Sequence, residues 1–246
     1  MKVFVTGGTG FVGREILGQL LSAGHEVRAL VRDGSQDKLS GHQNLETHIG
    51  DVTDAASLVG ALDGCDAVIH LVGIIREFPG RGITFKKIHV TATENILEAC
   101  DKQGVQRFLH MSSNGTRERG TTAYHRTKWQ AEELVRASGL DWTIFRPSLI
   151  FGRGSEFVKM LTELIRRVPV VPVIGDGQYR MQPVSVEQVA VSFVKALAMP
   201  ESIGKTYHQG GSESYTYDAI LDLTGKAMGR KQVTKVHQPL FMIKPM

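Results

Sequence analysis

The sequence has 246 residues, enough for one α/β domain with a generous core, and its 41% hydrophobic and 22% charged residues are typical of a globular protein. The net charge of +4 comes from scattered basic residues rather than a basic stripe, which favours phosphate-bearing small molecules over nucleic acid as partners. The cysteines, Cys65 and Cys100, form neither a CxxC motif nor a metal-ligand spacing with histidine, so we expect no disulfide, no metal site and a reducing compartment.

Apolar runs alternate with helical patterns over residues 1–152, which is the rhythm of βαβ units and predicts a parallel sheet. The elements expected in chain order are a strand at 3–6, a helix at 12–21, strands at 27–31 and 67–71, a helix at 88–99, a strand at 107–111, a helix at about 124–137 and a strand at 142–146. The first strand starts so early that no room is left for a signal peptide, so we expect a cytoplasmic protein.

The second half of the chain has shorter elements. We expect helices at residues 157–165, 186–198 and 217–228 and an extended segment at 170–174. The longest uncharged apolar stretch there, 168–175, is short and contains Pro169 and Pro172, so no transmembrane segment is expected. The predicted domains are a dinucleotide-binding core of residues 1–152, with a return segment at about 180–212, and a small substrate lobe made of 153–179 and 213–246.

A glycine-rich loop joins the first predicted strand to the first predicted helix. Gly7 would make the tight turn, Gly10 would let the backbone approach a pyrophosphate, and Gly13 would let helix and strand pack closely. The helix amino terminus offers free N–H groups to the phosphates. We therefore expect a dinucleotide to contact Gly7, Thr9, Gly10, Phe11, Val12 and Gly13.

The end of the second predicted strand bears on the choice of cofactor. A site selective for NAD places a carboxylate there to bind the ribose hydroxyls, but this position holds Val31 and is followed by Arg32. A guanidinium favours a 2′-phosphate, so the sequence predicts NADP(H) first and NAD(H) second. The alternative is that Arg32 is a solvated loop charge paired with Asp33.

Further motifs follow this loop in order along the chain. They are Gly50-Asp51-Val52, a run ending in Leu71-Val72-Gly73, Met111-Ser112-Ser113, Tyr124 with Lys128, and Arg146-Pro147-Ser148. With the TGxxGxxG spacing of residues 6–13, they resemble the short-chain dehydrogenase/reductase superfamily in its extended and atypical branches, from residue 1 to about 200. Arg32, the short gap between Ser113 and Tyr124, and the run 137–143 look most like a subgroup with bacterial proteins similar to the Rossmann-type accessory subunit of NADH:ubiquinone oxidoreductase.

The resemblance implies a fold, a cofactor site and a function. The fold would be α/β, a Rossmann-type doubly wound parallel sheet with a small carboxyl-terminal substrate lobe. Lys128 would hold the nicotinamide ribose, and Ser113 would hydrogen-bond the substrate oxygen. The remaining cofactor contacts would be Asp51 and Val52 near the adenine, with Leu71, Val72, Gly73, Tyr124 and Pro147.

The candidate catalytic residues are Tyr124, Lys128 and Ser113. Tyr124 and Lys128 are four residues apart on a predicted helix, so they share a face and can reach one ligand. An ammonium beside a phenol stabilises the phenolate, so we expect Lys128 to lower the pKa of Tyr124 and make it a proton donor and acceptor. Ser113 follows a predicted strand at its carboxyl end, where ligands bind in open α/β sheets.

Two departures from the family pattern weigh against catalysis. Where many extended members have an asparagine this chain has His89, which we expect to support the site at most, and the loop 114–122 is short. The first hypothesis is an NADP(H)-dependent oxidoreductase acting on a carbonyl or alcohol of a small substrate, such as a quinone or a nucleotide-linked sugar. The second is a non-catalytic NADPH-binding redox sensor or assembly subunit. Nucleic-acid binding is disfavoured because no patch combines aromatic and basic residues, and the sequence leaves the oligomeric state open.

Overall fold

The computed structural model describes residues 1–39 and 41–239. The chain forms two compact units, which we call the Rossmann unit (Met1–Pro147 and Glu187–Gln209) and the small unit (Ser148–Val186 and Gly210–Met246). The sequence predicts a return segment of about 180–212, and the part that joins the Rossmann unit is Glu187–Gln209.

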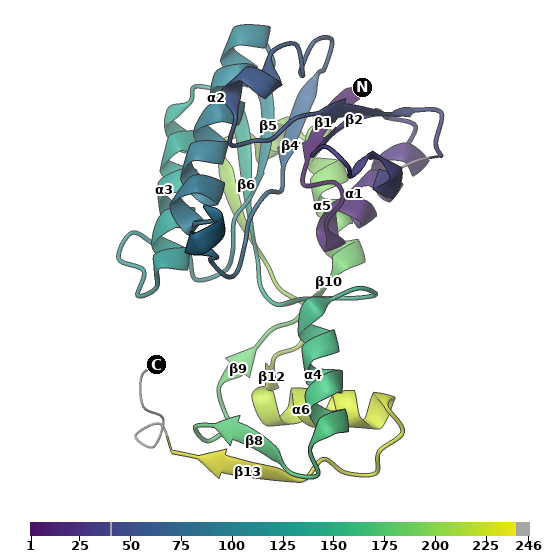
Figure 1. The fold of residues 1–246 in the computed structure, drawn as a ribbon, viewed down its shortest axis with the longest axis vertical. Coiled ribbons are helices and arrows are strands. Elements are labelled where there is room, and N and C mark those ends of the chain that lie inside the picture. The colour runs from purple at the N-terminus through teal and green to yellow at the C-terminus, as the bar shows by residue number, and fades with distance from the viewer. Residues whose placement is uncertain (40, 240–246) are drawn as a thin grey trace. The chain divides into compact units, whose positions relative to one another are not determined.

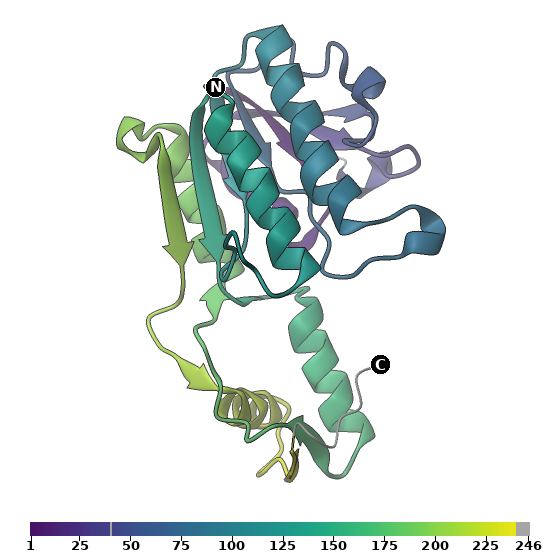
Figure 2. The ribbon, with the colours of Figure 1, turned by 90° about the vertical axis from the view of Figure 1, so that its left-hand side faces the viewer.

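The Rossmann unit is built on a seven-stranded parallel sheet with the order β3-β2-β1-β4-β5-β6-β11, which confirms the expected doubly wound fold. Its strands are β1 (Lys2–Thr6), β2 (Glu26–Val31), β3 (Leu45–Ile49), β4 (Ala67–His70), β5 (Arg107–Met111), β6 (Asp141–Pro147) and β11 (Lys205–Gln209). Helices α2 (Ala92–Gln103) and α3 (Ala123–Ala137) cover one face of the sheet, and α1 (Phe11–Ser22) and α5 (Val186–Leu197) cover the other (Figures 1 and 2).

Short helical turns fill the connections of this unit. They are the 3-10 helices η1 (Gln36–Leu39), η2 (Ala55–Leu58), η3 (Pro79–Arg81) and η5 (Pro200–Ser202), and the π-helix η4 (Lys86–Thr91). The helix predicted at 88–99 is therefore two elements, because the chain first forms the wide turn η4 and then α2. A π-turn within a helix often marks a functional position.

Parallel register brings three buried polar residues to the same level of the sheet. Thr6 of β1 lies beside His70 of β4, which lies beside His110 of β5. β1 and β4 end at Thr6 and His70, and β5 ends one residue after His110. The glycine loop, Gly73 and Ser113 follow there, so the candidate site forms along this edge.

On the α2 and α3 face, the core of the Rossmann unit contains a cluster of buried apolar side chains. Phe4, Val68, Phe108 and Ile144 come from four strands and have no exposed surface, and Ile96 of α2 packs against them. Burying such side chains contributes about 1.5–3 kcal/mol each. This rigid packing fixes the strand ends on which the site depends.

The small unit has its own core, formed by Leu161, Ile165, Val171, Val173 and Leu221. Ser155 caps the helix that starts at Glu156, its hydroxyl accepting a hydrogen bond from the Val158 amide. The elements are α4 (Glu156–Arg167), α6 (Tyr217–Ala227) and the paired strands β7 (Ile150–Phe151) with β10 (Val184–Ser185), β9 (Arg180–Met181) with β12 (Tyr215–Thr216), and β8 (Val171–Ile174) with β13 (Lys235–Gln238). Within the described part of the chain, no helix is both long and apolar enough to cross a membrane.

Candidate functional site

The glycine loop has the geometry of a phosphate-binding turn. Gly7 adopts a φ of +76°, which favours glycine, and its carbonyl accepts a hydrogen bond from the Gly10 amide at 3.0 Å. A Cβ on Gly13 would lie 2.2 Å from the Gly7 carbonyl oxygen, so only glycine lets α1 start this close to the loop. The first and third glycines are therefore required by the loop's own packing.

Gly10 differs because the space in front of it is open. It caps α1 with ordinary dihedrals (φ −77°, ψ 176°), and a Cβ there would contact only the Gly7 oxygen, at 3.2 Å. No side chain caps the α1 amino terminus, and its first turn carries no acidic residue. The amides of Phe11 and Val12 therefore face an approach that suits an anion.

Two arginines lie at or near this loop. The Arg14 Nε donates to the Thr9 carbonyl at 3.1 Å, so this guanidinium, which the sequence analysis did not single out, lies against the loop. Arg32 is exposed and directly follows β2. The Asp33 carboxylate accepts from the Gly34 amide (2.9 Å) and from the Gln36 amide nitrogen Nε2 (3.3 Å), and the described residues show no ion pair between Asp33 and Arg32.

The residues expected near the adenine are tied to the scaffold. Asp51 Oδ1 accepts from both the amide and the hydroxyl of Thr53, each at 2.8 Å, and the Val52 carbonyl accepts from Asn95 Nδ2 at 2.8 Å. Leu71 lies at the other side of the loop, where a Cβ on Gly7 would be 3.3 Å from its carbonyl carbon. The ends of β1 and β4 thus meet at the glycine loop.

Tyr124, Lys128 and Ser113 come together beside Gly73. The Lys128 side chain is buried (3% exposed), and its Nζ donates to the Met111 carbonyl at 3.0 Å. A Cβ on Gly73 would lie 3.0 Å from that Nζ, so the ammonium reaches the end of β4. The Ser113 hydroxyl hydrogen-bonds the Tyr124 phenol and lies 3.0 Å from the Thr116 hydroxyl.

The ionisation of the Tyr124 phenol differs from the sequence-based expectation. Burial raises the pKa of Tyr124, and the hydrogen bond from Ser113 opposes this only in part. The expectation that Lys128 lowers the pKa of Tyr124 is therefore wrong for this structure, because desolvation dominates and the ammonium donates to Met111 instead. The phenol stays protonated at neutral pH.

The Lys128 ammonium is itself strongly affected by its surroundings. Burial lowers the pKa of Lys128 to about 8, and the negative charge of Glu132 opposes that shift. The side chain is still mostly charged at neutral pH, but only by a narrow margin. A lysine held in this way can lose or gain a proton near physiological pH.

His89, in η4, packs directly against the candidate catalytic tyrosine. Its ring stacks on Phe85 (5.3 Å between centroids) and meets the Tyr124 ring edge-on at 5.4 Å. Its Nδ1 lies 2.9 Å from the Thr127 hydroxyl, and its Nε2 lies 3.1 Å from the Ile74 carbonyl. Burial, followed by the charge of Lys128, lowers the pKa of His89 to about 3, so the ring is neutral and fixes geometry rather than exchanging protons.

Sequence reasoning missed the acidic residue of this site. Glu132 is fully buried and binds Ser112, Arg136 and Arg146. Its position four residues after Lys128, on the same face of the predicted helix, is the sequence signal that could have identified it. Within the described residues no group of histidine, cysteine or acidic side chains has the arrangement of a metal site.

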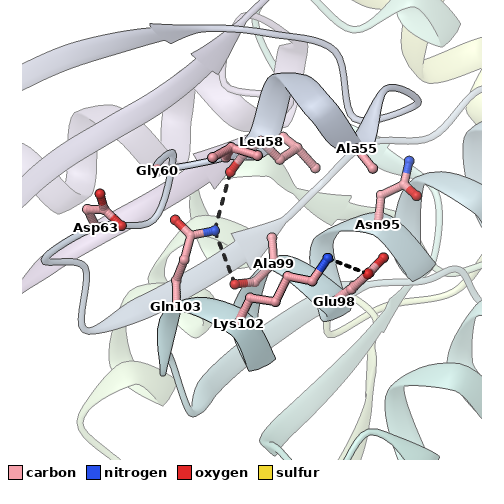
Figure 3. Close-up of a pocket in the computed structure, with 10 residues that line it drawn as sticks. Ala55, Leu58, Gly60, Asp63, Asn95, Glu98, Ala99, Lys102 and Gln103 are labelled. Carbon is pink, nitrogen blue, oxygen red and sulfur yellow. Dashed lines mark hydrogen bonds and ion pairs between the residues drawn. The ribbon is translucent and has the colours of Figure 1, made fainter.

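A separate hollow of about 370 Å³ lies in the Rossmann unit between η2 and α2 (Figure 3). Four polar side chains that line it, those of Asn95, Glu98, Lys102 and Gln103, already have partners in the protein. Gln103 Nε2 donates to the Leu58 and Ala99 carbonyls, and Lys102 pairs with Glu98 at 2.6 Å. None of the expected site residues lines it, so we do not connect it with the chemistry at the sheet edge.

The chain is similar to known proteins in both sequence and fold. The family model described as the NAD dependent epimerase/dehydratase family matches residues 3–210. The chain is 33% identical over 224 residues to the 3 beta-hydroxysteroid dehydrogenase/Delta 5-->4-isomerase of Mycobacterium tuberculosis, covering 80% of this chain and 60% of that protein. It is 30% identical over 228 residues to the mitochondrial NADH dehydrogenase [ubiquinone] 1 alpha subcomplex subunit 9 of Arabidopsis thaliana, covering 89% of this chain and 56% of that protein.

The chain therefore spans somewhat more than half the length of these curated relatives. Among solved structures, it is similar to a double mutant of dTDP-glucose 4,6-dehydratase from Streptomyces venezuelae, solved with NAD bound. The TM-score is 0.81 at 23% identity, over 97% of this chain and 85% of that one. That likeness supports the shared fold.

Proposed function

Because the chain belongs to the NAD dependent epimerase/dehydratase family, within the extended short-chain dehydrogenases/reductases, we propose that it is an NADP(H)-binding oxidoreductase acting on a carbonyl or alcohol of a small substrate. The observation that carries this proposal is the meeting of Tyr124, Ser113 and Lys128 next to Gly73. A proton donor, a hydrogen-bond donor and a cation lie together at the carboxyl edge of the sheet. Ligands bind at this edge in folds of this class.

The residues present suit a dinucleotide. Gly7 and Gly13 shape the loop, and Gly10 has no side chain that would block a phosphate from its backbone. The uncapped amino terminus of α1 would attract the pyrophosphate. Lys128 would hold the nicotinamide ribose, with Asp51 on the adenosine side. A bound nicotinamide supplies or accepts the hydride.

Arg32 supports NADP(H) over NAD(H). It is exposed and directly follows β2, and the described residues show no ion pair that would neutralise it. Val31 offers no carboxylate for a 2′-hydroxyl. A 2′-phosphate would gain a charge-assisted hydrogen bond from the guanidinium, and NAD(H) is the second choice.

The chain's own residues would manage the proton. The Tyr124 phenol, protonated at neutral pH because burial raises its pKa, donates its proton to the carbonyl oxygen as the carbonyl carbon receives the hydride. Ser113 donates a hydrogen bond to the same oxygen. In the reverse direction the Tyr124 oxygen accepts the proton of the alcohol, so the phenol must first lose its own proton, which burial disfavours.

A substrate panel tests this proposal. Quinones, aldehydes, nucleotide sugars and 3β-hydroxysteroids or the matching ketosteroids, the last suggested by the name of the mycobacterial relative, are screened by NADPH absorbance. We expect turnover with at least one of them, and Tyr124→Phe serves as the control that lacks the hydroxyl. Turnover that is equal in Tyr124→Phe removes the catalytic assignment.

The second candidate is a non-catalytic NADPH-binding subunit that senses redox state or supports assembly. Its support is the 30% identity to a protein named as a subunit of NADH dehydrogenase, together with a tyrosine whose pKa is raised rather than lowered. Tight NADPH binding without turnover on any compound of the panel favours this candidate. Two free cysteines support a reducing compartment, and we propose the cytoplasm.

A further inference from the structure

We propose that Glu132 is a positioning residue of the candidate catalytic site: its buried carboxylate fixes the turn that carries Ser113 and sets a negative charge one helical turn from the Lys128 ammonium. This inference rests on the proposed function, because it assigns a role relative to Ser113 and Lys128. The sequence pattern of Tyr124, Lys128 and Ser113 does not by itself assign a role to Glu132.

The Glu132 carboxylate is saturated with hydrogen bonds although it is fully buried. Oε1 accepts from the Ser112 hydroxyl at 2.5 Å and from Arg146 Nε at 2.8 Å. Oε2 accepts from Arg146 Nη2 at 2.6 Å and from Arg136 Nη2 at 2.5 Å. A buried charge is tolerated when it is paired and hydrogen-bonded in this way, so the carboxylate remains ionised.

This network joins three elements of the Rossmann unit. Glu132 and Arg136 belong to α3, Arg146 lies near the end of β6, and Ser112 follows β5 directly. Cation–π contacts add to this network, since the centre of the Trp129 ring lies 4.9 Å from the Arg136 guanidinium carbon and 5.8 Å from that of Arg146. The network locks α3 to two strand ends.

Ser112 is the link from this network to the reacting groups. The residue before it, Met111, provides the carbonyl that accepts from Lys128, and the residue after it, Ser113, bonds the Tyr124 phenol. The Ser112 amide also donates to the Phe145 carbonyl at 2.7 Å. Any displacement of the Ser112 hydroxyl from Glu132 therefore shifts Ser113 relative to Tyr124.

The second part of the inference concerns charge. The titratable groups that face Lys128 from other elements are His70 on β4, His89 in η4 and His110 on β5, and burial lowers the pKa of each so that all three are neutral. On α3 itself, Tyr124 is a neutral phenol and Glu132 is the carboxylate whose charge favours the ammonium.

Arg136 and Arg146 are balanced by Glu132 itself, and Arg136 also pairs with Glu133. Glu132 thus holds Lys128 charged against burial. Removing its charge would leave Lys128 beside neutral groups and two positive guanidiniums.

The test compares two neutralising substitutions on the same helix. Glu132→Gln removes the buried carboxylate, whereas Glu133→Gln removes a neighbouring carboxylate that is 54% exposed and also pairs with Arg136. The Lys128 ammonium is titrated by NMR of side-chain-labelled lysine in the protein without dinucleotide. We expect its midpoint to fall by about one pH unit in Glu132→Gln, the lower end for a close opposite charge, and to stay unchanged in Glu133→Gln. Equal midpoints in both variants overturn the charge role.

Ser112→Ala tests the positioning role and keeps every ion pair of Glu132. We expect the loosened Ser113 to lose its bond to Tyr124, so the Tyr124 midpoint, followed by NMR of ring-labelled tyrosine, rises as it does in Ser113→Ala. A Tyr124 midpoint identical to wild type overturns this role. Should Glu132→Gln not fold, which circular dichroism reveals, Ser112→Ala carries the test. These readouts need neither cofactor nor substrate, whereas failure to bind NADPH would count against the proposed function alone.

Discussion

Replacing Lys128 by methionine should stabilise the protein at neutral pH, because the Lys128 side chain is buried and still carries a charge there. The pKa of Lys128 falls from 10.5 to about 8, and this difference corresponds to a cost of about 3 kcal/mol for keeping the ammonium charged in the native state. Methionine has a similar length and no charge. It loses a hydrogen bond from a charged group to the Met111 carbonyl, about 2 kcal/mol, so we expect a net gain of about 1 kcal/mol in the free energy of unfolding at pH 7.

The pH dependence of this gain follows from the direction of the shift. The unfolded chain keeps the lysine proton up to about 10.5, whereas the native protein releases it from about 8. Over this interval the unfolded state binds more protons, so wild-type stability rises with pH. The penalty is fully present below pH 8 and is lost as the pH approaches 10.5, so the advantage of Lys128→Met should shrink over the same interval.

Urea unfolding followed by tryptophan fluorescence measures this directly, because Trp129 and Trp142 are the two tryptophans of the chain and both lie in the Rossmann unit. Lys102→Met is the matched control, since that side chain is 68% exposed and pairs only at the surface with Glu98. It should change the free energy of unfolding by less than about 0.5 kcal/mol. A Lys128→Met variant that is less stable than wild type at pH 7, or whose advantage is the same at every pH, refutes the reasoning.

Three further substitutions separate shape, binding and chemistry. Gly10→Val should keep the fold, because its Cβ would meet only the Gly7 oxygen, at 3.2 Å. It should abolish dinucleotide binding, measured by calorimetric titration, because the rest of the side chain would fill the place of the pyrophosphate. Unchanged affinity in the folded variant contradicts this. Gly13→Ala should lower both the midpoint of thermal unfolding and the affinity for the dinucleotide, because its Cβ would lie 2.2 Å from the Gly7 oxygen and the loop must shift. A midpoint of thermal unfolding equal to that of wild type counts against the described loop. Tyr124→Phe should keep NADPH affinity and lose turnover by about a hundred- to ten-thousand-fold in the absorbance assay, because only the hydroxyl moves a proton.

The helices and strands were predictable from the sequence wherever the spacing of apolar residues is regular. The alternation over residues 1–152 led to the parallel sheet, and the loop after β1 was evident from Gly7, Gly10 and Gly13. Besides the two-residue strands β7, β9, β10 and β12, three longer strands escaped prediction because they carry little apolar signal. They are β3, β11 and β13, with the sequences LETHI, KTYHQ and KVHQ, and their side chains are largely exposed or only partly buried. Pairing with a neighbouring strand, rather than their own composition, makes them extended.

The sequence predicted Tyr124, Lys128 and Ser113 as candidate site residues, but it gave no information on their ionisation. Spacing placed Tyr124 and Lys128 on one helix face, yet it carried no information on burial, which raises the pKa of the phenol. The Glu132 network was also beyond reach, because Arg146 approaches it from a strand fourteen positions along the chain. His89 stands in a π-turn, which has no simple residue signature, and only the structure reveals its contact with the Tyr124 ring.

The central claim, that the Rossmann unit binds NADP(H) through the glycine loop and Arg32, is tested most directly by equilibrium titration of wild type and Arg32→Ala with NADPH and with NADH. A hydrogen bond to a charged group contributes about 1.5–3 kcal/mol, so we predict that wild type binds NADPH at least about tenfold more tightly than NADH. Arg32→Ala should lose that preference and keep its affinity for NADH. Equal wild-type affinity for both dinucleotides, a preference for NADH, or no binding of either would contradict the account.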